Sequence, residues 1–314
     1  MVNHTLWSNI HGLSELKKNG RRVGHIRFKG KGWYKTLNYN QSDFSFNGNV
    51  LYLSKIGDIR VKMHRPIQGK IKGVIIKQEG QKWYAIIQLD SEIRVLPPND
   101  RAVGVDVGLK SFAVDSDGYD FANPRYLGHM LDRIKNIQRD LSRKKKGSNN
   151  REKAKAKLTK VHDKANNQRN DFLHKLSRYY VNSYGTICVE ALDVKGLKEK
   201  GHDKGLHRNI HDAAWSRFVM MLDYKAESAG RRLIKVEPKD TTQRCSKCGN
   251  IVKKTLRDRV HDCPYCGLHV DRDYNAAVNI LIAGMGHPVA PVEPMPLLRI
   301  TVEQALAMKQ EAPS

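Results

Sequence analysis

The chain has 314 residues, of which 56 are Lys or Arg and 32 are Asp or Glu, giving a formal net charge of +24 at pH 7. No run approaches the roughly 18 apolar residues of a membrane span, and the first residues lack the basic-then-apolar pattern of a signal peptide. Composition therefore argues against membrane and secreted proteins. It favours a folded protein with a polyanionic partner, most commonly nucleic acid, over a generic basic surface.

Residues 1–98 hold short apolar runs separated by Asn-Gly and Gly-Asp turn signals, which predict a small β-barrel. A basic stretch with interleaved aromatic residues lies near its start. Such a stretch can bind phosphates and stack on bases, although the aromatic residues fit a barrel core equally well. The candidate nucleic-acid contacts in it are Arg21, Arg22, Arg27, Lys29 and Lys31.

Three strands are predicted next, over residues 102–107, 111–114 and 119–122. The Asp117-Gly118 pair between the last two is a hairpin signal, so we expect the three strands to be antiparallel. Further along the chain the pattern predicts a buried strand at 186–190, a helix at 213–229 ended by Gly230, a strand at 232–237 and a last helix at 273–283. The polar segment between 190 and 213 is expected to be a loop.

Between the third and fourth strands, apolar residues recur at helical spacing and Gly147 to Asn150 interrupt them, which predicts a helical hairpin within residues 125–183. Residues 133–178 contain 16 Lys or Arg against 4 Asp or Glu, a net charge of +12. A solvated helix face usually mixes signs, so this imbalance favours an arm that contacts phosphates. The contacts expected at its tip are Arg143, Lys144, Lys145 and Lys146.

Four of the five cysteines form two C-x-x-C pairs separated by 14 residues, Cys245 with Cys248 and Cys263 with Cys266. This spacing predicts a structural, four-coordinate Zn²⁺ site in a zinc ribbon, and a redox pair would not explain the second knuckle. Gly249 and Gly267 permit the tight turns after each pair. The remaining Cys188 fits a small core residue. Thiolate ligands also indicate a reducing compartment, so we expect a cytoplasmic, nucleoid-associated protein.

Three carboxylates interrupt or end apolar elements: Asp106 within 103–108, Glu190 after 187–189, and Asp273 at the start of the last helix. A charge in a core element is costly unless it is paired or binds a metal. One such residue would fit a structural acid, whereas three in separate elements indicate a shared cation site. Gly104 and Gly108 would leave room for a nucleic-acid backbone near Asp106.

Three histidines follow in the polar segment after the fourth strand. They fit surface histidines better than a second metal site: His202, His207 and His211.

The element order is that of an α/β, ribonuclease H-like mixed sheet. In such a sheet the first and fourth strands are neighbours, which would bring Asp106 near Glu190, and the closing helix would deliver Asp273. Carboxylate oxygens suit Mg²⁺ or Mn²⁺, and two such ions can stabilise the attacking and leaving oxygens at a phosphodiester. The sequence therefore predicts metal-dependent phosphodiester chemistry.

The segments Gly104–Lys110, Val189–Leu192 and Asp271–Ala277, together with the two cysteine pairs, occur in the order found in one family. Over residues 20–285 the chain resembles TnpB/OrfB-type proteins, transposon-encoded relatives of the type V CRISPR effectors. The resemblance implies a RuvC-like nuclease with a helical hairpin insertion and an inserted four-cysteine zinc ribbon, preceded by a wedge-like barrel. It also implies a guide RNA from the transposon end and cleavage of matching double-stranded DNA.

By motif match the catalytic acids would be Asp106, Glu190 and Asp273, with Asp271 the weaker candidate for the third. Family members carry a first wedge strand and a helical recognition segment that we do not find here, so a shortened wedge domain is expected. The predicted division is a wedge-like domain at 1–98, a nuclease domain at 99–240, a zinc ribbon at 241–270, a closing helix at 271–285 and a flexible tail at 286–314. Two alternatives remain: a regulator that binds DNA without cutting it, and a strand-transferring transposase.

Overall fold

The computed structural model describes residues 2–26, 30, 33–80, 82–90, 92, 95–193, 196, 203–238, 240–255, 258–286 and 296–311. Of the expected nucleic-acid contacts, Arg27, Lys29 and Lys31 lie outside these residues, as does His202. The chain divides into two compact units, residues 1–92 and residues 93–314. None of the described helices is both long and apolar enough to cross a membrane.

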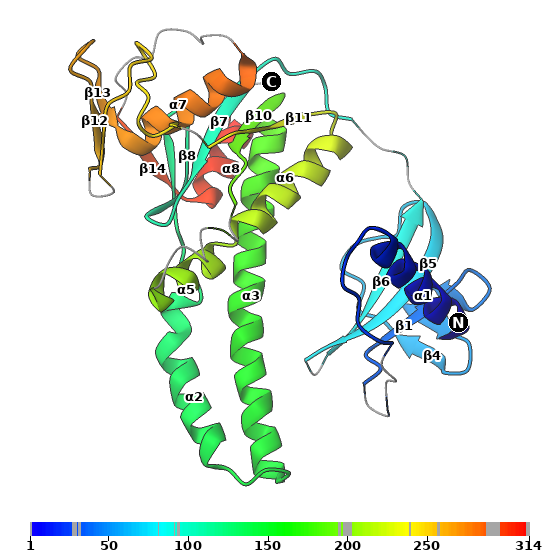
Figure 1. Cartoon of the computed structure of the whole chain (residues 1–314). Coiled ribbons are helices and arrows are strands. Elements are labelled where there is room, and N and C mark those ends of the chain that lie inside the picture. Colours follow the sequence, from blue (N-terminus) through cyan, green and yellow to red (C-terminus); the bar gives the residue numbers. More distant parts are fainter. Residues whose placement is uncertain are drawn as a thin grey trace. The chain divides into compact units, whose positions relative to one another are not determined.

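The described residues of the first unit form one helix and two small sheets (Figure 1). Helix α1 (Val2–Lys18) was not predicted, because apolar side chains such as Trp7 are exposed and mark no buried face. Each sheet is antiparallel and has three strands, in the orders β1-β5-β6 and β2-β3-β4. Their bounds are β1 (Thr36–Tyr39), β2 (Phe44–Asn47), β3 (Val50–Leu53), β4 (Gly57–Arg60), β5 (Lys70–Glu79) and β6 (Lys82–Asp90).

The two sheets share a small core in which Tyr39, Leu51, Leu53 and Val74 are buried. The β5–β6 hairpin turns at Gly80, whose φ of 58° favours glycine. The pairing among the described residues gives two separate sheets, so closure into a barrel stays a prediction.

The second unit is built on a six-stranded mixed sheet in the order β11-β10-β7-β8-β9-β14. Strands β7, β8 and β9 are antiparallel, whereas β10 runs parallel to β7 and β11 parallel to β10. The predicted adjacency of the first and fourth strands is thereby confirmed. The bounds are β7 (Ala102–Val107), β8 (Ser111–Asp115), β9 (Tyr119–Ala122), β10 (Thr186–Glu190) and β11 (Arg232–Val236).

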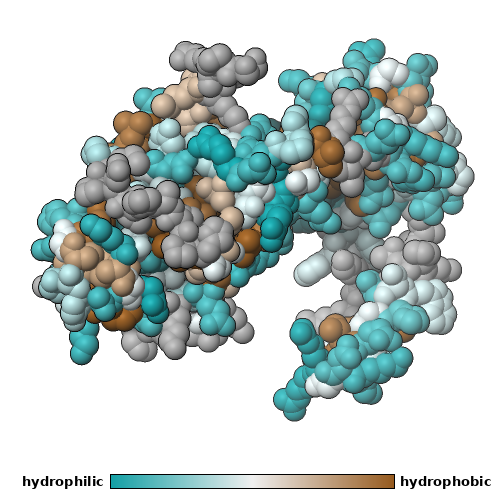
Figure 2. Space-filling model, turned by 90° about the horizontal axis from the view of Figure 1, so that it is seen from above, coloured by the Kyte–Doolittle hydropathy of each residue, from teal (hydrophilic) through white to brown (hydrophobic). Residues whose placement is uncertain are grey.

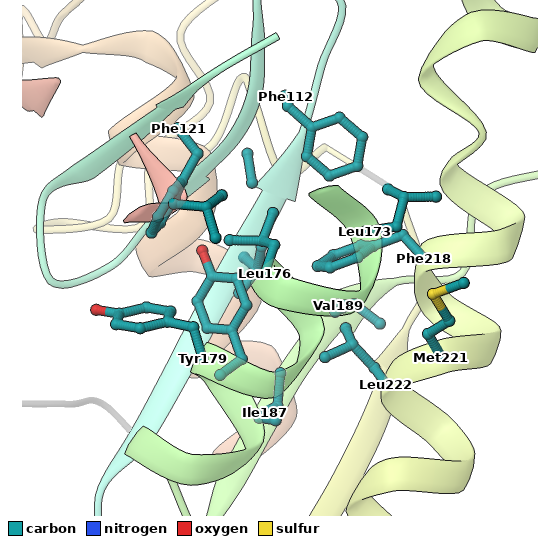
Figure 3. Close-up of a cluster of buried hydrophobic side chains, with 14 of the residues drawn as sticks. Phe112, Phe121, Leu173, Leu176, Tyr179, Ile187, Val189, Phe218, Met221 and Leu222 are labelled. Carbon is teal, nitrogen blue, oxygen red and sulfur yellow. The ribbon is translucent and has the colours of Figure 1, made fainter. Parts of the chain in front are cut away.

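Side chains alternate between the two faces of this sheet, so each strand serves two cores. On one face, α3 (Asn149–Ser183) and α6 (Trp215–Ser228) cover the main hydrophobic cluster, where rings such as Phe112 and Phe218 pack edge to face at 5.3 Å (Figure 3). On the other face, α7 (Arg272–Met285) packs on β7, β8, β10 and β11. Cys188 is fully buried there beside Ile280, which confirms it as a core residue.

The predicted helical hairpin is formed by α2 (Leu131–Arg143), preceded by a short 3-10 turn η1 (Gly128–Met130), and by α3 (Figure 1). Ser148 caps α3 by accepting a hydrogen bond from the backbone N–H of Arg151. At the base of the hairpin, the carboxylate of Asp212 accepts from the backbone N–H groups of Leu127 and Gly128 and pairs with Arg169 at 3.4 Å. This cluster anchors both helices to the body of the second unit.

Helix α5 (Lys204–Ala213) occupies part of the segment predicted to be a loop, so that prediction is wrong for these residues. Asp203 supplies the N-cap by accepting from the N–H groups of Gly205 and Leu206. The amphipathic helix predicted at 213–229 begins only after Ala214, whose positive φ of 56° separates α5 from α6.

The prediction of a flexible tail is wrong for residues 296–311. Strand β14 (Leu298–Ile300) pairs in parallel with β9 at the sheet edge, and α8 (Val302–Glu311) packs on α3. Ile300, Val302 and Ala305 are buried in the main core. These short elements carry little periodicity of their own and are stabilised by burying apolar area against elements far away in the sequence.

Candidate active site

Asp106 and Glu190 lie near the ends of two neighbouring strands, β7 and β10. In the parallel β7–β10 pair, Gly104 is opposite Cys188 and Val105 is opposite Val189. The pairing ends there, and one step further the same register would put Glu190 beside Asp106, since adjacent strands are about 5 Å apart. Asp106 is two residues after Gly104, and Glu190 is two residues after Cys188. Residues two apart on a strand face the same side of the sheet, so the side chains of both acids lie on the α7 side.

Helix α7 approaches this edge of the sheet because Gly104 has no side chain. A Cβ at Gly104 would overlap the carbonyl oxygen of Ala277 and stand 2.6 Å from the backbone nitrogen of Leu281. The expectation that Gly104 leaves room for a nucleic-acid backbone is therefore wrong, since α7 fills that space. A Cβ at Gly108 would lie 3.1 Å from the carbonyl oxygen of Ser111 and would meet no other described atom within 4 Å.

Asp271 and Asp273 have different tasks at the start of α7. The carboxylate of Asp271 caps the helix by accepting from the backbone N–H groups of Asp273 at 2.7 Å and Tyr274 at 3.3 Å. Asp273 lies in the first turn and lines the same cavity as Asp106. Of the two acids, Asp273 is thus the one that shares a cavity with the sheet carboxylate.

This cavity has a volume of about 230 Å³ and contains both acidic and basic side chains. Besides the two acids, its polar lining comprises Lys110, Ser111, Thr242, Arg259 and Arg272. Arg272 pairs with Asp273 through Nε at 3.1 Å and Nη2 at 3.0 Å. The site is therefore a mixed-charge cavity and not a purely acidic one.

Burial and mutual repulsion perturb the carboxylates. The pKa of Asp106 is raised well above its ordinary value, first by burial and then by the negative charges of Glu190 and Asp273. Burial also raises the pKa of Glu190, opposed by a hydrogen bond that the Thr241 hydroxyl donates to Glu190 Oε1. The charges of Glu190 and Asp273 therefore reach Asp106, although the three described acids do not form a group with the spacing of a metal site, as the four cysteines do.

The cysteine-containing segment is fastened to the site by two buried asparagines of α7. Asn279 Nδ2 donates to the carbonyl oxygens of Thr241 and Arg244, at 2.8 and 2.7 Å. Asn275 donates to the Arg244 carbonyl at 2.8 Å and accepts from the Ser246 N–H at 3.0 Å. The segment that carries Thr241 to Ser246 is thus held directly on the helix that carries Asp273.

The four cysteines form a site able to hold a metal ion. Their Sγ atoms lie within 4.8 Å of one another, with Cys245–Cys266 and Cys248–Cys263 separations of 3.6 Å. Gly249 and Gly267 adopt positive φ values of 77° and 69°, as the knuckle turns require. The hairpin of β12 (Val260–Asp262) and β13 (His269–Asp271) completes this segment.

Most of the expected nucleic-acid contacts that the structure describes are solvent-exposed. Arg21 and Arg22 are exposed in the first unit, and Arg143, Lys145 and Lys146 at the tip of the hairpin. Lys144 is partly buried and pairs with Asp140 at 2.9 Å. The surface seen in Figure 2 is largely hydrophilic. Among the described residues, His207 and His211 belong to no group with metal-binding spacing.

Several residues around the carboxylates were not predicted as site residues from the sequence, namely Lys110, Thr241, Thr242, Arg259 and Arg272. Two features of the sequence could have pointed to them: Arg272 stands between two acids, and a Thr-Thr pair stands shortly before the first cysteine. Neither has a chemical signature strong enough to identify a site by itself.

Two family models match parts of the chain. The model described as OrfB_IS605, "Probable transposase", matches residues 86–201, and the one described as "Cas12f1-like, TNB domain" matches residues 215–280. The chain is also 32% identical over 296 residues to the "Putative RNA-guided DNA endonuclease InsQ" of Escherichia coli K12, covering 89% of this chain and 74% of that protein. The chain belongs to the TnpB/OrfB family.

A second relative, a "Putative RNA-guided DNA endonuclease" of Streptomyces pristinaespiralis, is 34% identical over 253 residues. That match covers 79% of this chain but 62% of the relative, so the chain spans about three fifths of its length. Among solved structures, a chain of a Cas12f1-sgRNA-target DNA complex matches with a TM-score of 0.54 at 16% identity, covering 87% of this chain and 69% of that chain. At this identity the match shows the fold alone.

Proposed function

We propose that this TnpB-type protein is an RNA-guided, divalent-metal-dependent DNA endonuclease with a RuvC-like site formed by Asp106, Glu190 and Asp273. The observation that carries the proposal is the shared electrostatic environment of acids from β7, β10 and α7, two of which line one cavity. The names of the relatives supply the RNA guide and the DNA substrate.

The donor set fits Mg²⁺ or Mn²⁺. All three side chains offer hard carboxylate oxygens, the ligands these ions prefer. Burial, and after it the charges of Glu190 and Asp273, raises the pKa of Asp106, and a divalent ion bound there would favour the ionised carboxylates. When bound, such ions would stabilise negative charge on the attacking and leaving oxygens of the phosphodiester.

The chain's own residues would divide the remaining work. Asp106 and Glu190 are fixed by adjacent strands, and the Thr241 hydroxyl holds one oxygen of Glu190 in place. Asp273 is aligned by a helix whose cap is Asp271. Hydrolysis would break the bond between phosphorus and the 3′ oxygen, leaving a 5′-phosphate and a 3′-hydroxyl.

The charge distribution supports a nucleic-acid grip that is independent of sequence. If base pairing with RNA reads the DNA, the protein needs mainly backbone contacts. The hairpin of α2 and α3, net +12 over residues 133–178, and the exposed Arg21 and Arg22 would supply them. We assign Zn²⁺ to the four cysteines, since a closed tetrahedral thiolate set is typical of a structural zinc site.

The test uses the purified protein with its co-purified RNA. That RNA is sequenced, and a plasmid carrying a matching sequence is incubated with the complex and Mg²⁺. We expect linear product with wild type and none with Asp106→Asn, Glu190→Gln or Asp273→Asn, while all three still bind RNA. Asp271→Asn is the matched control and should cut, because Asn caps a helix as well as Asp.

Two outcomes would replace the proposal. DNA binding without cleavage by wild type would favour the non-cutting regulator. Joined strand-transfer products in place of linear breaks would favour a transposase that uses the same acids. Undiminished cutting by Asp106→Asn would reject the site assignment.

A further inference from the structure

Arg272 holds the carboxylate of Asp273 with two donors of its guanidinium. Nε and Nη2 both reach Oδ1, at 3.1 and 3.0 Å, and the two side chains are only 14% and 19% exposed. A charge-assisted contact of this kind is strong where solvent access is low. Asp273 therefore already has a cation, provided by its own sequence neighbour.

The same guanidinium is anchored in the cysteine-containing segment. Its Nη1 donates to the carbonyl oxygen of Asp258 at 3.0 Å, and the Arg272 backbone N–H donates to the carbonyl of Arg259 at 2.8 Å. Arg272 thus links the segment just before β12 to the start of α7. A displacement of that segment would be transmitted to the carboxylate.

The charge of Arg272 reaches beyond Asp273. It also lowers the pKa of Asp106, against the raising effect of the neighbouring acids. A divalent ion held by Asp106 and Asp273 would stand close to this guanidinium and be repelled by it. The two cations therefore compete for the Asp273 carboxylate, of which Arg272 holds Oδ1.

Arg272 and Arg259 both line the 230 Å³ cavity that contains Asp106 and Asp273. Guanidinium groups match phosphate oxygens as well as they match carboxylate oxygens. A phosphodiester that enters this cavity would therefore offer Arg272 an alternative anionic partner.

We propose that Arg272 is a resident counter-ion of Asp273, which weakens binding of divalent ions until a DNA-strand phosphate takes over its guanidinium. The inference rests on the proposed function, since it assumes that the three acids hold the metal. It goes further in that binding of the DNA strand would strengthen metal binding, with Arg272 as the residue responsible.

Arg259 provides a matched control in the same cavity. Its Nη1 is 3.9 Å from Asp273 Oδ2, and its side chain is 46% exposed, so its charge is better screened. If the position of the charge matters, and not only its sign, removal of Arg272 should change Mn²⁺ affinity much more than removal of Arg259.

The first experiment titrates Mn²⁺ into the full, zinc-loaded chain without nucleic acid, by calorimetry. We expect Arg272→Gln to bind Mn²⁺ at least about tenfold more tightly than wild type, and a tenfold step corresponds to only ~1.4 kcal/mol of relieved repulsion. Arg259→Gln should change the affinity by less than about threefold. Asp106→Asn should weaken binding strongly in either background.

Unchanged or weaker Mn²⁺ binding by Arg272→Gln, with Asp106→Asn still weakening it, would overturn the counter-ion role and leave the proposed function standing. If Asp106→Asn leaves Mn²⁺ binding unaltered, both the proposed metal site and this inference are rejected. Should Arg272→Gln fail to fold, Arg272→Lys is the second variant. Lysine keeps the positive charge but cannot make the two-donor guanidinium contact, so this variant should bind Mn²⁺ more tightly than wild type, by a smaller factor than expected for Arg272→Gln.

The second experiment adds a short single-stranded oligodeoxynucleotide before the Mn²⁺ titration. It should tighten Mn²⁺ binding to wild type and have a clearly smaller effect on Arg272→Gln, in which no guanidinium remains to be released. An equal gain in both proteins would contradict release by phosphate.

Discussion

Gly104 of β7 lies directly against the carbonyl oxygen of Ala277 in α7, which occupies the space of a side chain at that position. This contact fixes the closest approach of the helix that carries Asp273 to the strand that carries Asp106. The spacing of the candidate acids therefore depends on a glycine that has no chemical role.

Gly104→Ala should destabilise the protein by about 1–3 kcal/mol or more, because a new methyl group would have to displace helix backbone. The shift of α7 should also reduce Mn²⁺ binding. Urea denaturation measures the stability change. Gly128→Ala is the control, since its Cβ would meet nothing closer than 3.5 Å, and equal stabilities of the two variants would refute the packing argument.

Thr241 is expected to act through Glu190. Thr241→Val removes the hydroxyl that donates to Glu190 Oε1 and should lower Mn²⁺ affinity or cleavage by about 10- to 100-fold, as for other groups that orient metal ligands. Thr241→Ser keeps the donor and should restore most of the activity. A serine variant as impaired as the valine variant would show that the methyl group matters and not the hydrogen bond.

Removal of the Zn²⁺ that we assign to the four cysteines should loosen the segment around them while the main sheet persists. That segment packs on Val114 and Val278 in a cluster separate from the main core. Chelation of the purified protein should release about one Zn²⁺ per chain. Hydrogen exchange should then rise in residues 241–271 and remain low in residues 102–107. Exchange rising equally in both would indicate one cooperative unit.

Asp115 should make stability depend on pH. It is fully buried, and burial raises its pKa to about 7, although the backbone N–H groups of Tyr119 and Asp117 donate to it. The folded state therefore retains a proton that the unfolded state releases above its ordinary value of 3.8. Stability should fall as pH rises from about 4 to about 7, by at most ~1.4 kcal/mol per pH unit from this group.

The Asp115→Asn variant isolates that contribution. An asparagine oxygen can still accept from the two backbone N–H groups, and its amide can donate to Tyr180. Denaturation at pH 5, 6 and 7 should give a stability difference between wild type and variant that changes steadily with pH. Parallel pH curves for the two proteins would contradict the shifted pKa.

Much of the central sheet was predictable from sequence, because period-two apolar runs and the Asp117-Gly118 turn delimit β7, β8 and β9. The acids stood out for the same reason, as charges in apolar runs. Strand β14 and helix α8 were not predictable, since their burial is supplied by β9 and α3. Asp271 caps α7 and Arg272 pairs with Asp273, and both roles depend on hydrogen bonds that composition and spacing do not encode.

Anomalous scattering from crystals of the RNA-bound protein soaked in Mn²⁺ tests the central claim most directly. We predict an anomalous peak within bonding distance of the carboxylates of Asp106 and Glu190, with Asp273 as a further ligand of the same site. Mn²⁺ bound elsewhere, with these three carboxylates uncoordinated, would contradict the account.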